Sequence, residues 1–141
     1  LYIPIVYMME HWGNPIWRLF HVMVEKIDET EFRKNKILII DLINYIGCNL
    51  PCIFCTEHYK RSNYICHGDV FHKNGLKILL WEIHNRVNTS KHTPQFKINI
   101  IKQYEELDIL DVMNDFYEKI YIYDCMDMDF IKKKFNNIKF K

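Results

Sequence analysis

Leu50-Pro51-Cys52-Ile53-Phe54-Cys55-Thr56-Glu57-His58 is the stretch of sequence around which the fold is organised. Its C-x-x-C pair, Cys52 and Cys55, follows Pro51, and proline is tolerated in the first turn of a helix but not in its interior. The pattern therefore predicts a helix that begins near Cys52 and runs to about Asn63. At a helix N-terminus the dipole favours a thiolate and lowers the cysteine pKa, as disulfide exchange requires. The same spacing also fits half of a zinc site.

A first helix is predicted before this stretch, over Ile16–Ile27. Asn14-Pro15 is typical of a helix start, with Asn as N-cap and Pro at the first helical position. On this helix Trp17 and His21 are four residues apart, so their side chains share one face. The apolar residues 1–9 indicate a strand or helix lead-in, because they are far fewer than the roughly 20 residues of a membrane span.

A second helix is predicted over Phe32–Ile46. Gly47 follows it as a C-terminal stop, since glycine readily adopts the left-handed conformation found at helix ends. The expected buried face consists of Ile37, Ile40, Leu42, Ile43 and Ile46.

A further helix is predicted over Leu76–Asn88, opened by Asn74-Gly75. Its expected buried side consists of Leu76, Leu79, Leu80, Ile83 and Val87. A second face carries Trp81, His84, Asn85 and Asn88 at positions i, i+3, i+4 and i+7. Such a face suits a flat heteroaromatic ligand. The alternative, a satisfied core histidine beside two surface amides, stays open on this helix alone.

After Pro94 the sequence predicts shorter amphipathic helices. They cover Phe96–Tyr104, Leu107–Tyr121 and Asp127–Phe140. The fold class is therefore all-α. Residues 10–104 are predicted to form one domain, and residues 105–141 a helical extension packed on that domain or on a dimer partner.

Composition narrows the function further. The 141 residues are 49% hydrophobic, which is enough for one domain with a substantial core. A net charge of +1 with interleaved acids and bases argues against a nucleic-acid partner. The cysteines are Cys48, Cys52, Cys55, Cys66 and Cys125. An odd number of cysteines argues against a closed disulfide framework and favours redox chemistry or metal binding.

Three segments together resemble one family, the FAD-linked sulfhydryl oxidases of the Erv/ALR type. The first, Trp12-Gly13-Asn14-Pro15-Ile16-Trp17-Arg18-Leu19-Phe20-His21, is similar to the family's W-G-x-x-x-W-x-x-x-H opening. The second, residues 51–58, resembles its P-C-x-x-C-x-x-H redox helix. The third, Trp81-Glu82-Ile83-His84-Asn85-Arg86-Val87-Asn88, resembles its W-x-x-H-N-x-V-N helix. The resemblance implies a four-helix bundle plus a short fifth helix that holds FAD.

The resemblance also implies a site. The expected FAD-binding residues are Gly13, Trp17, His21, His58, Trp81, His84, Asn85, Val87, Asn88 and Lys91. Cys55 is implied to face the flavin and Cys52 to meet the incoming thiol. The chain departs from the family's usual basic positions near the cofactor, so Arg86, Lys91 or His92 are the expected phosphate contacts.

The implied activity is a thiol oxidase that passes electrons from a dithiol through Cys52 and Cys55 and FAD to O2, giving H2O2. Its implied partners are protein dithiol substrates or a thioredoxin-like carrier, and a second copy bound through the first two helices. Cys125 stands alone in the tail, without the shuttle dithiol of cellular members. The chain thus resembles the minimal forms of large DNA viruses, and for a viral protein the implied location is the host cytoplasm or the virion. For a cellular member of the family, the implied location is an intracellular compartment in which disulfides form.

Two other classes use a similar cysteine pair. A zinc-stabilised helical interaction module would take Cys52, Cys55, His58 and either Cys66 or His67 as ligands. It leaves the Trp/His and His/Asn faces without a purpose. A thioredoxin-like oxidoreductase needs an alternation of strands and helices that this sequence does not show.

Overall fold

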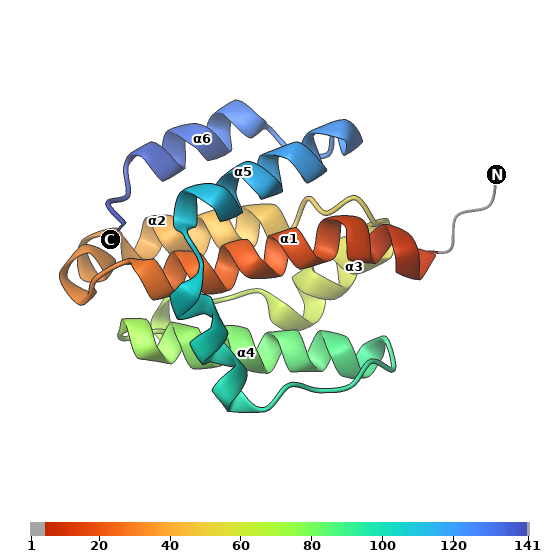
Figure 1. The fold of residues 1–141 in the computed structure, drawn as a ribbon, viewed down its shortest axis with the longest axis horizontal. Helices are drawn as coiled ribbons and strands as arrows, with labels where there is room; N and C mark the ends of the chain where they lie inside the picture. The colour runs from red at the N-terminus through yellow and green to blue at the C-terminus, as the bar shows by residue number, and fades with distance from the viewer. Residues whose placement is uncertain (1–4, 141) are drawn as a thin grey trace.

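A computed structural model describes residues 5–140, with side chains from residue 11 onward, and every regular element in this range is a helix (Figure 1). In chain order the elements are α1 (Ile5–Lys26), α2 (Glu29–Gly47), α3 (Ile53–His58), η1 (Tyr59–Asn63), η2 (His67–Asp69), α4 (Lys73–Ser90), η3 (Ile98–Glu106), α5 (Ile109–Ile120), η4 (Tyr121–Tyr123) and α6 (Met128–Asn136). The predicted all-α fold is confirmed. None of the helices within residues 5–140 combines the length and hydropathy of a membrane span.

Helix α1 lies at the centre of the fold. It packs against α4 and η3 as well as against α5, while α2 contacts α4 and α6. Figure 1 shows α5 and α6 lying over α1 and α2, on the side away from α4. The short α3 lies near α1 and α4, beside the segment that leaves α2. This arrangement brings the cysteine stretch next to the first and fourth helices.

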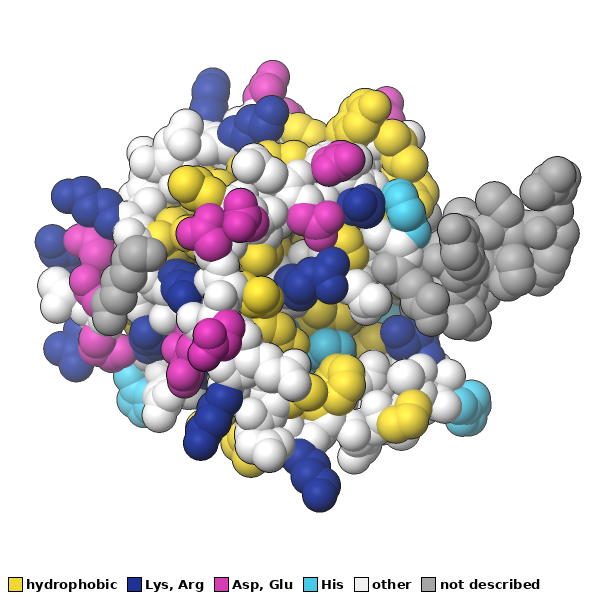
Figure 2. All heavy atoms as spheres, viewed as in Figure 1, with side chains coloured by type: hydrophobic (Ala, Val, Ile, Leu, Met, Phe, Trp, Pro, Cys, Tyr) yellow, Lys and Arg dark blue, Asp and Glu magenta, His cyan; other side chains and the backbone are white. Residues whose placement is uncertain are grey.

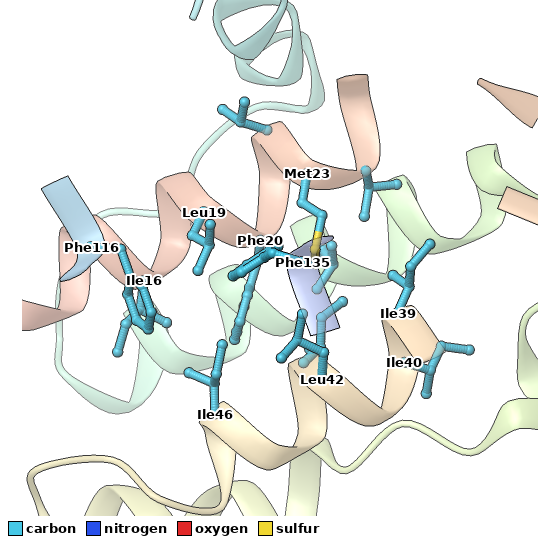
Figure 3. Packing of buried hydrophobic residues seen from close by; sticks show 14 of the residues in the cluster. Ile16, Leu19, Phe20, Met23, Ile39, Ile40, Leu42, Ile46, Phe116 and Phe135 are labelled. Carbon is cyan, nitrogen blue, oxygen red and sulfur yellow. The ribbon is translucent and has the colours of Figure 1, made fainter. Parts of the chain in front are cut away.

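The hydrophobic core is one cluster that reaches from the bundle into the last two helices (Figure 3). Its labelled members are Ile16, Leu19, Phe20 and Met23 from α1, Ile39, Ile40, Leu42 and Ile46 from α2, Phe116 from α5 and Phe135 from α6. Burying one such side chain contributes about 1.5–3 kcal/mol. The surface is mixed in charge, and Figure 2 shows acidic and basic side chains interspersed on the viewed face.

The predicted start of the first helix was wrong. Helix α1 is already helical at Ile5, and Pro15 lies inside it rather than at its first position. Residues 1–4 of the predicted lead-in lie outside the described residues. Proline removes one helical donor, which costs about 3 kcal/mol. Burial of Trp12 and of Pro15 itself offsets this cost. An Asn-Pro pair therefore does not always indicate a helix start: here the residues around it are buried in the core, and the helix continues through the proline.

Helix α2 differs from its prediction at the start and on one face. It begins at Glu29, where the carboxylate of the N-cap Asp28 accepts a hydrogen bond from the Glu31 amide at 2.7 Å. At Asn35 the backbone leaves helical geometry, with φ −115° and ψ 15°. This kink changes the direction of the side chains around it, and Ile37, predicted to be buried, is 60% exposed. The other four predicted residues of this face are buried.

Gly47 ends α2 for a reason other than the predicted one. No glycine in the described range has a positive φ, so a left-handed stop is not what Gly47 supplies. A Cβ atom at this position would lie 2.5 Å from the ring of Tyr59. Only glycine leaves room for that ring, which is itself buried. Gly47 therefore permits a close contact between α2 and the helix that follows the cysteines.

The later helices lie close to their predicted positions but differ from the predictions in their ends, their buried residues or their helix type. Helix α4 begins at Lys73, earlier than the start predicted at Asn74-Gly75. Its N-cap is His72, whose Nδ1 accepts a hydrogen bond from the Gly75 amide at 3.1 Å. Leu79 and Val87 of its predicted buried side are only half-buried. The segment predicted as a helix over Phe96–Tyr104 is a 3-10 helix, η3. Helices α5 and α6 are shorter than predicted.

Candidate active site

The cysteine pair opens helix α3 as predicted. Cys52 is the N-cap, with extended backbone at φ −120° and ψ 119°, and its Sγ accepts a hydrogen bond from the Cys55 amide at 3.2 Å. Thr56 Oγ1 accepts from the Leu50 amide at 3.1 Å, which fixes the turn before the helix. The proline turn thus places Cys52 at the N-cap of the helix and Cys55 in its first turn. All five cysteines are free thiols.

The predicted fall in cysteine pKa is wrong for Cys55. Burial first, and then the hydrogen bond with Cys52, raise the pKa of the Cys55 thiol, and although the positive charge of Lys91 opposes them the pKa lies at about 12. The desolvation of a half-buried thiol outweighs the helix dipole here, because the charged form loses its water on the apolar side of the helix. Burial is also the main cause that raises the pKa of Cys48 and of Cys125.

The far end of the cysteine helix is fixed by one buried amide. Tyr59 donates its hydroxyl hydrogen to Asn44 Oδ1 at 2.7 Å. The same oxygen accepts from the Ile65 amide at 3.0 Å, and Asn44 Nδ2 donates to the Ile65 carbonyl at 2.8 Å. Asn44 is 3% exposed, so these bonds are shielded from water. They tie α2 to both ends of the segment that follows the cysteines.

A cavity of about 300 Å³ lies beside Cys55. Its walls are formed by Trp12, Gly13, Ile16, Trp17, Phe20, Gly47, Leu50, Phe54, Cys55, His58, Tyr59, Asn63, Val87, Ser90 and Lys91. Of the predicted site residues, it therefore brings together Gly13, Trp17, Cys55, His58, Val87 and Lys91. A Cβ at Gly13 would meet no heavy atom within 4 Å, so this glycine leaves open space. The volume is at the lower end of the roughly 300–1,000 Å³ of ligand pockets.

Aromatic rings stack behind the cavity wall. Trp17 and His84 lie parallel, with centroids 4.1 Å apart and 6° between the planes, and His21 stacks on Tyr104 at 4.5 Å. His21 Nε2 and His84 Nδ1 share a hydrogen bond at 3.2 Å. Burial, and then the other ring, lowers the pKa of His21 to about 3. Burial, and then Lys91, lowers the pKa of His84 to about 4. Both rings are neutral at pH 7, and neither lines the cavity.

The predicted polar face of α4 is buried under the segment around Phe96. Trp81 Nε1 and Asn85 Nδ2 both donate to the Phe96 carbonyl, at 3.1 and 2.9 Å, and the Phe96 amide donates to Asn85 Oδ1 at 2.8 Å. Trp81 and Asn85 also line a second, more open hollow of about 590 Å³, which shares His58 and Ser90 with the first cavity. Asn85 is buried, so the interpretation of this face as carrying surface amides is wrong.

Asn88 is the one predicted site residue with an unmet hydrogen-bonding need. It is 3% exposed, and its Nδ2 has no hydrogen-bond partner among the described residues. A buried donor without an acceptor costs about 1–3 kcal/mol. Its neighbours Val87 and Lys91 belong to the cavity wall. Asn88 itself does not line the cavity.

The predicted phosphate contacts are separated. Lys91 is exposed at the cavity wall, and His92 is exposed with a left-handed backbone at φ 57°. Arg86 borders the second hollow and donates from Nε to Asn63 Oδ1 at 3.2 Å.

The zinc alternative finds no support in the described part of the chain. No group of three or more His, Cys, Asp or Glu side chains there is arranged to hold a metal ion. Cys55 and His58 line the cavity, whereas Cys66 is exposed and His67 pairs with Asp41 at 2.6 Å. The four proposed ligands are therefore not brought to one point.

Comparison with known proteins gives one result. Residues 14–107 match the family model described as Erv1 / Alr family. No curated protein and no solved structure matches the chain. The matched segment contains the cysteine helix, the α4 residues of the cavity wall and the stacked rings behind it, and of the α1 wall it contains Ile16, Trp17 and Phe20 but not Trp12 and Gly13. Because this segment is more than half of the chain, the protein belongs to the Erv1 / Alr family, and membership implies FAD-linked sulfhydryl oxidase activity.

Proposed function

We propose that this chain is a flavin-dependent thiol oxidase in which Cys52 and Cys55 form the reactive disulfide. One observation carries the proposal: Cys55 lies in the wall of an apolar cavity, while Cys52, the N-cap of the same short helix, does not line that cavity. This difference supports a division of roles in which Cys55 would face a bound aromatic group and Cys52 would meet the incoming substrate. The alternative assignment, a zinc-stabilised interaction module, has no comparable support.

The residues of the cavity fit an isoalloxazine ring. Trp17 and Val87 offer apolar contact to a flat group, and the open space at Gly13 admits its edge. Asn88 does not line the cavity, but it follows Val87 directly in α4 and its amide has no partner among the described residues, so we assign it as the donor to a carbonyl or ring nitrogen of that group. Lys91 supplies a positive charge beside it. When bound, FAD would supply a two-electron acceptor for the reduced cysteine pair, and dioxygen, taking up two electrons and two protons, would be the final acceptor and give hydrogen peroxide.

The cysteines divide the exchange chemistry between them. A substrate thiolate attacks Cys52 Sγ, the Cys52–Cys55 bond breaks, and Cys55 leaves as a thiolate. A second substrate thiolate then attacks the substrate sulfur of the mixed disulfide, so that the substrate disulfide forms and Cys52 is released. Burial disfavours the Cys55 thiolate, and Lys91 is the cation whose charge opposes that penalty. The neutral His21 and His84 rings keep the wall behind the cavity free of competing charge.

The proposal extends to partners and organisation. A protein dithiol or a thioredoxin-like carrier would donate the electrons. Residues 10–104 would form the oxidase domain and residues 105–141 its extension, since α5 packs on α1 and α6 on α2. The homodimer through the first two helices and the kinship with minimal viral forms stay predictions. The extension already packs on both helices that such a dimer would use.

Absorbance and oxygen consumption test the assignment. Purified protein supplied with FAD is expected to show flavin bands and to consume oxygen with dithiothreitol. Cys55→Ser is expected to abolish consumption and to keep the flavin. Cys66→Ser is the matched control, because Cys66 is exposed and does not line the cavity, and it is expected to retain full activity. A colourless protein with stoichiometric zinc, or unimpaired turnover by Cys55→Ser, would refute the assignment.

A further inference from the structure

The two residues between the reactive cysteines are large, apolar and exposed. Ile53 is 67% exposed and Phe54 is 78% exposed, on the first turn of α3. Leu50, Cys52 and Cys55, by contrast, pack against the hydrophobic core. Single exposed apolar side chains are common on protein surfaces. Two in succession beside a reactive thiol form a specific apolar surface, which we call the Ile53/Phe54 surface.

Disulfide exchange brings a substrate onto this surface. The substrate sulfur must come within about 2 Å of Cys52 Sγ to form the mixed disulfide. Cys52 is the N-cap, and Ile53 and Phe54 are the next two residues of the same turn. The residues that flank the substrate cysteine are therefore held next to these two side chains whenever exchange takes place. Ile53 belongs neither to the core nor to the cavity wall, whereas Phe54 also lines the cavity, so Ile53 is the residue that tests substrate contact alone.

The charges nearby do not compete for this contact. Glu57 and Lys60, further along the same segment, pair with each other at 3.7 Å. Glu57 and Lys60 therefore add little net charge beside Cys52, and Lys91, which shares the cavity wall with Phe54, is a nearby cation outside this pair. A protein that still awaits its disulfide exposes apolar residues that are buried once it is folded, and these match such a surface.

We propose that Ile53 and Phe54 determine substrate specificity by binding an apolar segment that flanks the reactive cysteine of a protein dithiol. This inference rests on the proposed function and adds the substrate class to it. Half-burial of one isoleucine and one phenylalanine side chain against such a segment is expected to favour it about tenfold over a polar one. A small thiol without flanking residues gains nothing from this contact.

A flavin-independent exchange reaction tests the proposal. In the full chain carrying Cys55→Ser, the Cys52 thiolate attacks the peptide sulfur of a peptide–thionitrobenzoate disulfide. The Cys52–peptide bond forms, the bond to thionitrobenzoate breaks, and the coloured thiolate leaves. A peptide with Leu and Phe beside its cysteine is expected to react about tenfold faster than one with Ser on both sides. Ile53→Ser and Phe54→Ser, each in this background, are expected to remove most of that preference.

Two controls separate substrate contact from other effects. Cysteine–thionitrobenzoate reports the intrinsic reactivity of Cys52, and Ile53→Ser is expected to leave its rate unchanged. Phe71→Ser is the matched surface variant, because Phe71 is 81% exposed and lies just before α4 with Lys36 over its ring. It is expected to keep the full preference. Thermal melts of all variants are expected to agree with the parent, since the substituted side chains are exposed.

Three results would overturn the proposal: equal rates for the two peptides, a preference that survives both substitutions, or a homodimer in sedimentation that either substitution dissolves. The last would show that a second copy of the chain covers the Ile53/Phe54 surface. Failure of the proposed function is distinguishable, because it appears as absent flavin or absent oxygen consumption in the unmodified chain. The exchange reaction depends on neither.

Discussion

Gly47→Ala is expected to destabilise the protein by forcing apart α2 and the segment after the cysteines. The added Cβ would lie 2.5 Å from both Cε1 and Cζ of Tyr59. That ring cannot move freely, because it is 7% exposed and its hydroxyl group is bonded to Asn44 Oδ1 at 2.7 Å. Either the ring shifts and weakens this hydrogen bond, or the backbone of α2 moves.

The expected magnitude follows from two opposing effects. Overpacking of a well-packed site costs about 1–3 kcal/mol. Replacing glycine by alanine in a helix returns up to about 1 kcal/mol. The net loss in the free energy of unfolding is then about 1–2 kcal/mol, which corresponds to a fall of about 3–8 °C in Tm for a chain of this size.

Thermal unfolding followed by circular dichroism measures this loss. Gly13→Ala is the matched control, since a Cβ there meets no heavy atom within 4 Å, and its Tm is expected to equal or exceed that of the parent. Adding Tyr59→Leu to Gly47→Ala is expected to cost less than the sum of the two single changes, because the smaller side chain makes room for the methyl group. A Gly47→Ala protein that melts at the parental temperature, or strictly additive losses, would refute the steric explanation.

Three further predictions concern buried polar groups. Lys77→Met is expected to lower the free energy of unfolding by about 3 kcal/mol, because it leaves the Glu25 carboxylate, only 14% exposed, without the ammonium group 2.6 Å away. In urea titrations, a double variant that also carries Glu25→Leu is expected to recover part of this loss. An unchanged urea midpoint for Lys77→Met would contradict the prediction. His21 and His84 bind protons less readily in the folded than in the unfolded chain, since their pKa values are lowered from 6.5 to about 3 and about 4. Stability is therefore expected to fall by about 2–4 kcal/mol between pH 7 and pH 5, and less in a His21→Phe/His84→Phe variant; parallel pH profiles of the two proteins would count against this. Asn88→Leu is expected to weaken FAD binding about tenfold in fluorescence titrations. The flavin-free variant is expected to be as stable as the parent or more stable, because the substitution removes an unpartnered buried amide. Unchanged FAD affinity would show that the amide does not face the cofactor.

The sequence predicted helices well where apolar spacing alone decides them. The second and fourth helices and the cysteine helix appear within a few residues of their predicted positions. The start of α1 was missed, because Asn14-Pro15 carries a strong local signal that the burial of Trp12 overrides. Ile37 was misplaced since the kink at Asn35 breaks the periodicity on which the prediction depended.

The candidate site was predictable as a set of motifs but not as a geometry. The spacing of Trp17 and His21, and of His84 after Trp81, indicated shared faces, and Trp17, His21 and His84 do lie together in the ring stack. Trp81 instead donates a hydrogen bond to the Phe96 carbonyl. The sequence could not show that Tyr104 completes this stack. Such a long-range contact depends on where the chain returns after Pro94, and no periodicity encodes it.

Tyr59 and Asn44 were missed for a similar reason. A tyrosine one residue after a motif histidine and an asparagine in an amphipathic helix both look like surface residues in the sequence. Their hydrogen bond becomes visible only once Gly47 is seen to admit the tyrosine ring. A glycine at the end of a helix, followed by an aromatic residue after the next turn, is a signal that could have suggested this contact.

The packing of α5 on α1 has a consequence for the order of folding. Arg18 and Asp115, which join the two helices through an ion pair at 3.1 Å, are 97 residues apart in the sequence. Contacts of such high sequence separation form late, since a long loop must close before they stabilise the chain. One side of α1 therefore stays open to water until the last helices arrive, while its other side already carries residues of the cavity. The helix that forms part of the cavity wall is thus held in place by a helix that is synthesised about 80 residues after it, and a chain released before α5 would expose the apolar face of α1 to aggregation.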